Sequence, residues 1–382
     1  MFDLSKFIAI DNHAHSIERH FLQLDKIAFR HSFSESKSLS LLNNDLGFSL
    51  SFVDFLNNLQ RVTGSHSEEE FLSKRIDYDE IDYMRRLFDD VSLTALIIDD
   101  GFGPDSMLEL GELAEWSGRT IFCCRRIETV LEQLIPEVAS FDELQATFAE
   151  RLLRYAGAEI VGLKTIAAYR GGLNIETISA QDARRDFDSC KRELSEQLHN
   201  HILPRIGRRP LYHHMLLSAF EIAGEQKLPI QVHTGIGDDD ALLSESNPLC
   251  LQKLLKSQLF DKTKFVLLHG YPYVKEAAYL ASLYNNVFLD LSLAMNLNSL
   301  NAVSMLRETL SLTPYNKLLA GSDGHSTPEA HWWGMHSWRR ALSQLLDEFI
   351  DSGLLSENQA EDLAAAVLHG NAMSLYKLEG LV

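Results

Sequence analysis

Two histidines near the start of the chain, His13 and His15, have the spacing of a chelating pair. They follow the apolar run 7–10, which predicts a short buried strand. Because residues two apart on a strand point to the same side, both imidazoles can face one point. Imidazole suits zinc, iron, nickel or copper better than magnesium or calcium. The pair alone is weak evidence, since an isolated His-x-His motif more often has no metal role.

Three further polar residues, His233, His269 and Asp323, each close an apolar run later in the chain. A glycine lies within two residues of each and frees the loop that follows. Singly, each reads as a core histidine or a loop-capping aspartate. Together with the first pair they predict a catalytic metal site with an open position for water. We expect about one divalent transition ion, zinc before others, on the ligands His13, His15, His233 and Asp323.

Residues so far apart can meet only if the strands that carry them end at one place. Apolar strands alternate with amphipathic helical stretches along the chain, and eight strands are predicted: 7–10, 93–98, 120–124, 160–166, 228–233, 264–269, 287–291 and 318–323. An open doubly wound sheet would more often show a glycine-rich turn after its first strand, where this chain has histidines. The pattern favours an α/β fold, a closed (β/α)8 TIM barrel whose carboxyl-terminal strand ends converge on one mouth.

The segment 16–91 interrupts this rhythm and is too long for a simple loop. Its apolar residues recur at helical spacing, which predicts a helical insertion after the first strand. Such an insertion falls beside the mouth of a barrel and can serve as a lid. We expect residues 1–382 to form a single barrel domain with this insertion.

These motifs together resemble the amidohydrolase superfamily of metal-dependent hydrolases. The similarity is nearer to its amidohydrolase-2 branch, including the amidohydrolase-like domain fused to glutamine synthetase-like proteins. The segments that carry it run from the first strand to the last helix: His13-Ala14-His15, 163–170, 231–235, His269-Gly270, 321–325 and 370–372. The resemblance implies a distorted (β/α)8 barrel in which His13, His15, His233 and Asp323 match the usual ligand positions. It is specific for fold and metal and uninformative about the substrate.

Lys164, at the end of the fourth predicted strand, has three readings. Some superfamily members carry a carboxylated lysine there that bridges two metals, so a second ion is an open alternative. We favour a cation that binds a substrate carboxylate together with Arg170, and a structural ion pair is the third reading. Tyr169 beside it is a candidate for orienting an acidic substrate, and His325 is a candidate for lining the mouth.

The mechanism expected from these residues is hydrolysis by metal-activated water, with Asp323 as proton shuttle and His269 polarising the carbonyl. The leading hypothesis is a hydrolase of a C–N, amide-type bond in a small carboxylate-bearing molecule, with a γ-glutamyl amide suggested by the fused relatives. A decarboxylase of the same branch needs the same metal and base, so the sequence leaves it open. A catalytically silent binding barrel is the third hypothesis, and the intact ligand set argues against it.

Composition limits the partners. The chain is 45% hydrophobic and 23% charged, as in a soluble globular protein, and its net charge is −19. That charge disfavours nucleic acid and anionic membranes, although a local basic pocket can still hold a small anionic substrate. No signal peptide or cysteine framework is evident, which indicates a cytoplasmic protein. A homo-oligomer is left open.

Overall fold

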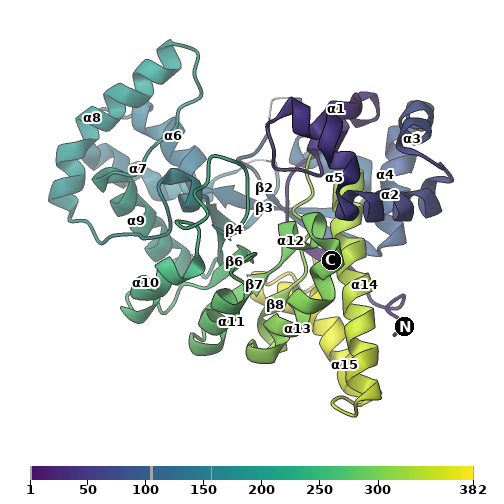
Figure 1. Ribbon diagram of the computed structural model, residues 1–382. Helices are drawn as coiled ribbons and strands as arrows, with labels where there is room; N and C mark the ends of the chain where they lie inside the picture. The colour runs from purple at the N-terminus through teal and green to yellow at the C-terminus, as the bar shows by residue number, and fades with distance from the viewer. Residues whose placement is uncertain (1, 104–105, 156, 382) are drawn as a thin grey trace.

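Eight parallel strands form the centre of the computed structural model, which describes residues 2–103, 106–155 and 157–381. They pair in chain order as β1 Ala9–Ala14, β2 Leu93–Asp99, β3 Thr120–Arg126, β4 Glu159–Thr165, β5 Ile230–Thr234, β6 Phe265–His269, β7 Val287–Asp290 and β8 Leu318–Leu319. Helices separate the strands and surround them (Figure 1), so the expected (β/α)8 TIM barrel is confirmed.

The helices between β1 and β2 are α1 Lys26–His31, α2 Leu50–Thr63, α3 Glu68–Arg75 and α4 Glu80–Asp90. The outer layer continues with α5 Leu110–Ser117, α6 Ile127–Glu137, α7 Phe141–Leu153, α8 Ala180–His199, α9 Pro210–Gln226, α10 Gln252–Lys256, α11 Val274–Leu283, α12 Ser292–Leu297 and α13 Ala302–Leu312. The chain ends with α14 Pro328–Asp351, α15 Glu357–Ala365 and α16 Asn371–Tyr376. Helices α1 to α4 gather at one side of the barrel, where α4 packs on α14 (Figure 1).

Alternation along the strands separates the inside of the barrel from its helical coat. On β2, Ala95 and Ile97 belong to a small interior cluster, while Leu96 and Ile98 join the larger cluster under the helices. Asp99 continues the inward series by one step and therefore faces the mouth. The interior cluster also includes Leu375 from α16, so the carboxyl-terminal helix contributes to this inner core.

The first and last strands differ from their expected bounds. β1 covers Ala9–Ala14, so His13 lies within the strand and His15 directly follows it. β8 covers only Leu318–Leu319, because from Ala320 onward the backbone bonds to β1, to Val367 and to Trp338 of α14 instead of continuing a regular ladder with β7.

Hydrogen bonds outside the regular ladder close the barrel between β1 and the segment after β8. The amide of Asn12 donates to the carbonyl of Ala320 at 2.9 Å, and the amide of Asp323 donates to the carbonyl of His13 at 2.8 Å. The buried Asp11 carboxylate accepts from the amide of Ser322 at 2.8 Å and from the Ser322 hydroxyl. These contacts, referred to below as the β1–β8 seam, hold residues 13 and 323 side by side.

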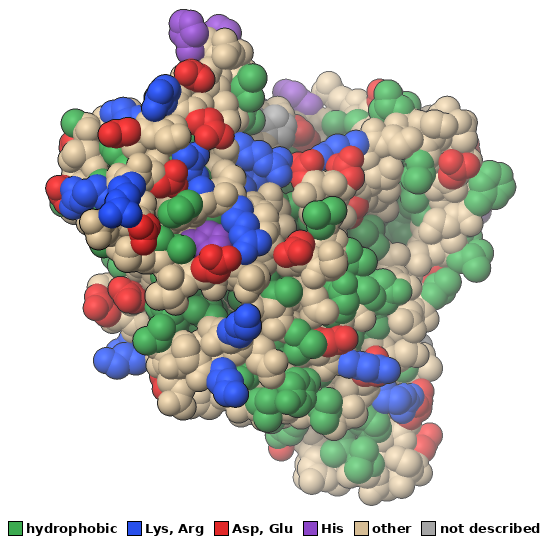
Figure 2. Space-filling model, turned by 60° about the vertical axis from the view of Figure 1, so that its left-hand side comes forward, with side chains coloured by type: hydrophobic (Ala, Val, Ile, Leu, Met, Phe, Trp, Pro, Cys, Tyr) green, Lys and Arg blue, Asp and Glu red, His purple; other side chains and the backbone are tan. Residues whose placement is uncertain are grey.

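The distribution of charged side chains on the surface is relevant to the expected lack of binding to nucleic acid and anionic membranes. Figure 2 shows a face on which basic and acidic side chains are interspersed rather than gathered into a basic patch. Among the described residues no helix is both long and apolar enough to cross a lipid bilayer.

The seam generates a stability prediction. Asp11→Ala leaves the buried amide and hydroxyl of Ser322 without an acceptor, so we expect a loss of about 1–3 kcal/mol in the free energy of unfolding. Urea denaturation followed by circular dichroism measures it. Asp11→Asn is the matched control, since its amide oxygen still accepts one hydrogen bond and should preserve more stability. Equal stability of wild type and Asp11→Ala would contradict the role given to the seam.

Candidate metal centre and active site

The two histidines of the motif are placed by β1 and are buried, with 0% exposure for His13 and 7% for His15. Their rings lie 5.0 Å apart between centroids and meet edge to face. The amide of His15 donates to the carbonyl of Gly324 at 2.8 Å, so the β1–β8 seam also fixes the backbone beyond the strand. The sequence prediction that both imidazoles face one point agrees with this arrangement.

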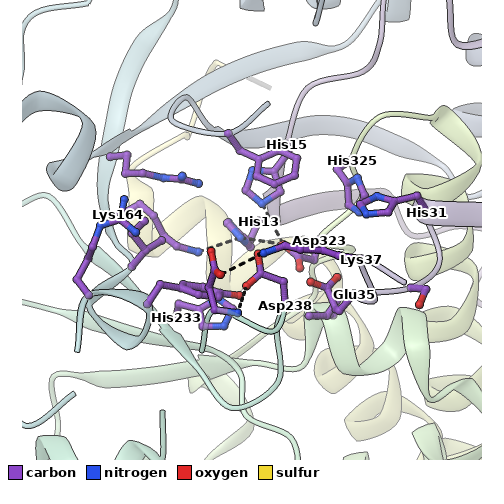
Figure 3. A pocket seen from close by; sticks show the side chains of 18 residues that line it. His13, His15, His31, Glu35, Lys37, Lys164, His233, Asp238, Asp323 and His325 are labelled. Atoms are coloured by element: carbon purple, nitrogen blue, oxygen red, sulfur yellow. Dashed lines mark hydrogen bonds and ion pairs between the residues drawn. The ribbon is translucent and has the colours of Figure 1, made fainter. Parts of the chain in front are cut away.

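Asp323 meets both imidazoles although it lies beyond β8. Its Oδ1 is 3.0 Å from Nε2 of His13 and 3.3 Å from Nε2 of His15 (Figure 3). Its backbone has φ of 53°, in the left-handed region that non-glycine residues rarely adopt. His269, at the end of β6, has φ of 66°. Such strained backbones cluster at functional sites, where the surrounding structure must hold them.

His233 joins this group through His269 rather than directly. Nδ1 of His233 is 3.0 Å from Nε2 of His269, and Nδ1 of His269 is 2.9 Å from the hydroxyl of Ser292. Two contacts compete for His269 Nδ1: the Ser292 hydroxyl at 2.9 Å and the amide of Leu293, which would donate to it over a longer 3.4 Å. Because Ser292 donates its own hydrogen to Asp290 at 2.8 Å, we assign the shorter contact as His269 Nδ1–H donating to Ser292. Nε2 of a neutral His269 then accepts from His233 Nδ1–H, which leaves Nε2 of His233 with a free lone pair.

The environment keeps the imidazoles neutral. Burial and then the Lys164 cation lower the pKa of His13 to about 4, and burial lowers those of His233 and His269 well below the usual value. Burial alone would raise the pKa of Asp323, but the neighbouring His269 and His13 hold it well below its usual range. Neutral histidines with an ionised carboxylate are the protonation states that bind a divalent metal.

Unpartnered buried atoms test whether the site fits a metal. Among the described residues, the buried Nε2 of His233 has no hydrogen-bond partner, and the buried Oδ1 of Asp323 has none beyond its contacts with Nε2 of His13 and His15. Ligand atoms of His13, His15 and Asp99 lie within 4.8 Å of one another, as do those of His13, His269 and Asp323. Imidazole nitrogens with a carboxylate oxygen form a donor set typical of zinc and similar ions, so these residues fit one. The ligand role of each residue stays a prediction.

Lys164 lies against this centre. Its Nζ is 3.0 Å from Nε2 of His13, and burial lowers the pKa of the ammonium, although Asp99 and Asp323 oppose that shift. This contact is compatible with both a substrate-binding cation and a carboxylated lysine, so the two readings stay open.

Asp99 and Arg126 were missed by the sequence reasoning. Arg126 donates from Nη2 to Oδ2 of Asp99 at 2.6 Å and from Nε to its Oδ1 at 3.0 Å. The signal for Asp99 was present in the sequence, because it closes the apolar strand 93–98 as Asp323 closes 318–322. Arg126 ends β3 and lies opposite Lys164 in the strand register.

The other predicted substrate-binding residues all line the same cavity, but their partners differ. Arg170 forms a hydrogen-bonded ion pair with Glu132, from Nη2 to Oε1 at 3.0 Å. The Tyr169 ring packs on His233, with centroids 4.5 Å apart. A Cβ on Gly237 would lie 1.9 Å from the Tyr169 hydroxyl, so only glycine leaves that space open. His325 is buried beside Phe102, and burial lowers its pKa to about 3.

The centre opens into a cavity of about 250 Å³. Its walls include four residues, from the last residue of α1 and the segment after it, that no sequence motif indicated: His31, Ser34, Glu35 and Lys37. Figure 3 labels His31, Glu35 and Lys37 among the side chains that line the cavity. Lys37 reaches the loop after β5, where its Nζ is 2.7 Å from Asp239 and 3.2 Å from Asp240. The segment between β1 and β2 therefore forms part of the cavity wall.

A family model described as Amidohydrolase matches residues 179–378, a stretch that includes β5 to β8 and Asp323. The chain belongs to this amidohydrolase family. A curated relative, Protein fluG of Emericella nidulans, is 30% identical over 408 aligned positions that cover 97% of this chain and 45% of that protein. The chain thus spans less than half the length of this relative.

Solved structures resemble the whole chain. A proposed metal-dependent hydrolase from Lactobacillus casei is 27% identical with a TM-score of 0.84, over 99% of this chain and 98% of that one. Uronate isomerase from Thermotoga maritima is 14% identical with a TM-score of 0.66, over 97% of this chain and 95% of that one. The second likeness concerns the fold alone.

The centre generates a metal prediction. We expect the purified protein to bind about one divalent transition ion, and His13→Ala to weaken that binding by more than the 10–100-fold that loss of a supporting residue costs. Elemental analysis and competition with a chelator measure both. His66→Ala, an exposed histidine of the segment between β1 and β2, is the control. Failure to take up zinc, manganese or iron after reconstitution would contradict the prediction.

Proposed function

We propose that this protein is a metal-dependent hydrolase of a C–N, amide-type bond in a small carboxylate-bearing molecule. The observation that carries the proposal is the approach of Asp323 Oδ1 to Nε2 of both His13 and His15 beside the cavity. Family membership and the likeness to the Lactobacillus casei protein support it. A γ-glutamyl amide, suggested by the resemblance to proteins fused to glutamine synthetase-like partners, is one candidate within this class.

The residues divide the work. A divalent metal bound by His13, His15, His233 and Asp323 would supply the Lewis acidity that activates water. Asp323 takes the proton of the attacking water and passes it to the leaving nitrogen. His269 would polarise the substrate carbonyl, a role that requires its Nε2 to carry a proton and to turn from His233 toward the substrate. Lys164, with Arg170 and Tyr169 near it, binds and orients the substrate carboxylate.

The products of the reaction distinguish a hydrolase from a decarboxylase and from a binding barrel without activity. We expect metal-loaded protein, offered a panel of acidic amides and aromatic acids, to release amine or ammonia. Release of CO2 from an aromatic acid without amine release would replace the proposal with decarboxylation. Full metal loading with no turnover across the panel would favour a binding barrel.

We also propose that residues 16–91 act as a lid, since Lys37 from this segment bonds to the loop after β5 beside the cavity. We propose a small anionic substrate and a cytoplasmic location on the grounds given above, and a homo-oligomer stays open.

Asp323→Asn tests the proton shuttle. Asn can still offer an oxygen to a metal but cannot accept the proton, so kcat should fall by a factor on the order of 10² to 10⁴ while much of the metal is retained. Steady-state kinetics and elemental analysis on the same preparation measure the two effects. A variant that keeps its metal and stays within a few fold of wild-type turnover would make His269 the better candidate base.

Lys164→Met separates the readings of this lysine. If the ammonium binds the substrate carboxylate, KM should rise about tenfold or more while metal content stays unchanged. Loss of a bridging carbamate would instead lower the metal stoichiometry, and added short-chain acids would partly restore activity. A Lys164→Met protein with less metal would therefore exclude substrate binding as the main role of Lys164.

A further inference from the structure

The cavity walls carry opposite charges on opposite sides. The cations Arg126 and Lys164 come from β3 and β4, and Arg170 follows on the short helix Ala167–Arg170. The acids come from the segment after α1 and from the loop after β5: Glu35, Asp238 and Asp240. Figure 3 shows Lys164 on one side and Glu35 on the other, with His13 and Asp323 between them.

On the side of β3 and β4, ion pairs neutralise two of the three cations. Arg126 is held by Asp99 and Arg170 by Glu132, each through more than one hydrogen bond. Lys164 instead contacts an imidazole, at 3.0 Å from His13. Lys164 is thus the wall cation whose hydrogen-bonded partner is not a carboxylate.

The acidic side is only partly neutralised. Lys37 is shared among Asp238, Asp239 and Asp240, and Arg205 adds an ion pair to Asp240 at 2.8 Å. Within the described part of the chain, no residue forms a hydrogen bond or ion pair with the carboxylate of Glu35, although this residue is half-buried and lines the cavity. Glu35 is therefore an acid with unused capacity to bind a cation.

The electrostatics around Glu35 agree with an unfilled site. Burial, followed by repulsion from Asp323 and Asp238, raises the pKa of Glu35 to about 8. A cationic group placed beside it would compensate both effects and favour the ionised carboxylate.

We propose that the substrate carries charges of both signs: a carboxylate bound on the Lys164 side, and an ammonium group on its amine portion bound by Glu35. The inference rests on the proposed function, because it places the amide to be cleaved beside His13 and Asp323, between the two charged ends. The substrate class is then an amide between an acid that bears a second carboxylate and an amine that bears a second amino group. Glu35 determines specificity for that amine.

Two matched compounds test this inference by binding alone. The monoamide of glutaric acid with putrescine has a terminal ammonium, and the monoamide with pentylamine replaces it by a methyl group of similar size. Calorimetric titration of zinc-loaded protein should show the putrescine amide binding about tenfold to a hundredfold more tightly. Glu35→Gln should bind both compounds with similar affinity. Glu69, an exposed glutamate of α3, provides the control, and Glu69→Gln should keep the preference for the putrescine amide.

Each outcome has a definite meaning. Equal affinity of the two amides for wild type, binding of neither, or a preference that survives Glu35→Gln would overturn the inference. Thermal unfolding of the variant in the absence of ligand shows whether it is folded, and Glu35→Asp provides a second variant that should retain part of the preference. Binding preference without amine release would leave the inference standing and would count against the hydrolase function alone.

Discussion

The β1–β8 seam is the constraint on which the active site depends. A barrel of parallel strands brings its carboxyl-terminal ends to one mouth, but β8 is too short to pair with β1 in a regular ladder. Individual hydrogen bonds from β1 to the segment after β8, together with the Asp11–Ser322 contact, replace that ladder. They bring a residue near the start of the chain to one 310 positions later in sequence, within 3.0 Å of it, and so create the convergence of His13, His15 and Asp323.

Burial of the mouth of the barrel explains how the polar groups there are paired. A buried charge costs several kcal/mol unless a partner compensates it, so the cations of the wall are either locked to acids or placed against a neutral imidazole. A row of hydrogen bonds runs from Asp290 through Ser292 and His269 to His233. Because Ser292 donates to Asp290, it accepts from His269 Nδ1–H, and this fixes Nε2 of His269 as the acceptor for His233. Groups beside the cavity that have no hydrogen-bond partner among the described residues are therefore informative: Nε2 of His233 points to a metal, and the carboxylate of Glu35 points to a substrate.

Much of the barrel and the central part of the site could be predicted from sequence, because apolar runs that end in His or Asp are local patterns. His233 and His269 were found in this way, and Asp99 carried the same signal but was not identified. Tertiary partners could not be predicted. That Glu132 would hold Arg170, or that Glu35 would enter the cavity, depends on how α6 and the segment after α1 pack on the barrel, and neither has a local signature. The length of β8 was also overestimated, since its apolar run continues although its backbone turns toward β1.

The residues that sequence could predict and those that it could not belong to two different parts of the site: the candidate metal ligands and the wall that faces the substrate. The candidate metal ligands lie on strand ends or in the seam, where the barrel fixes their positions, and chemistry placed there can be shared by relatives that act on different molecules. Recognition of the substrate falls partly to the segment between β1 and β2, whose Lys37 spans to the loop after β5 and whose Glu35 lines the cavity. A cavity wall formed by loop residues can change by insertion or substitution without disturbing the β1–β8 seam. Likeness in fold and in metal ligands therefore limits the class of reaction more than it limits the substrate, and the identity of the substrate has to be read from the side chains that this segment places in the cavity.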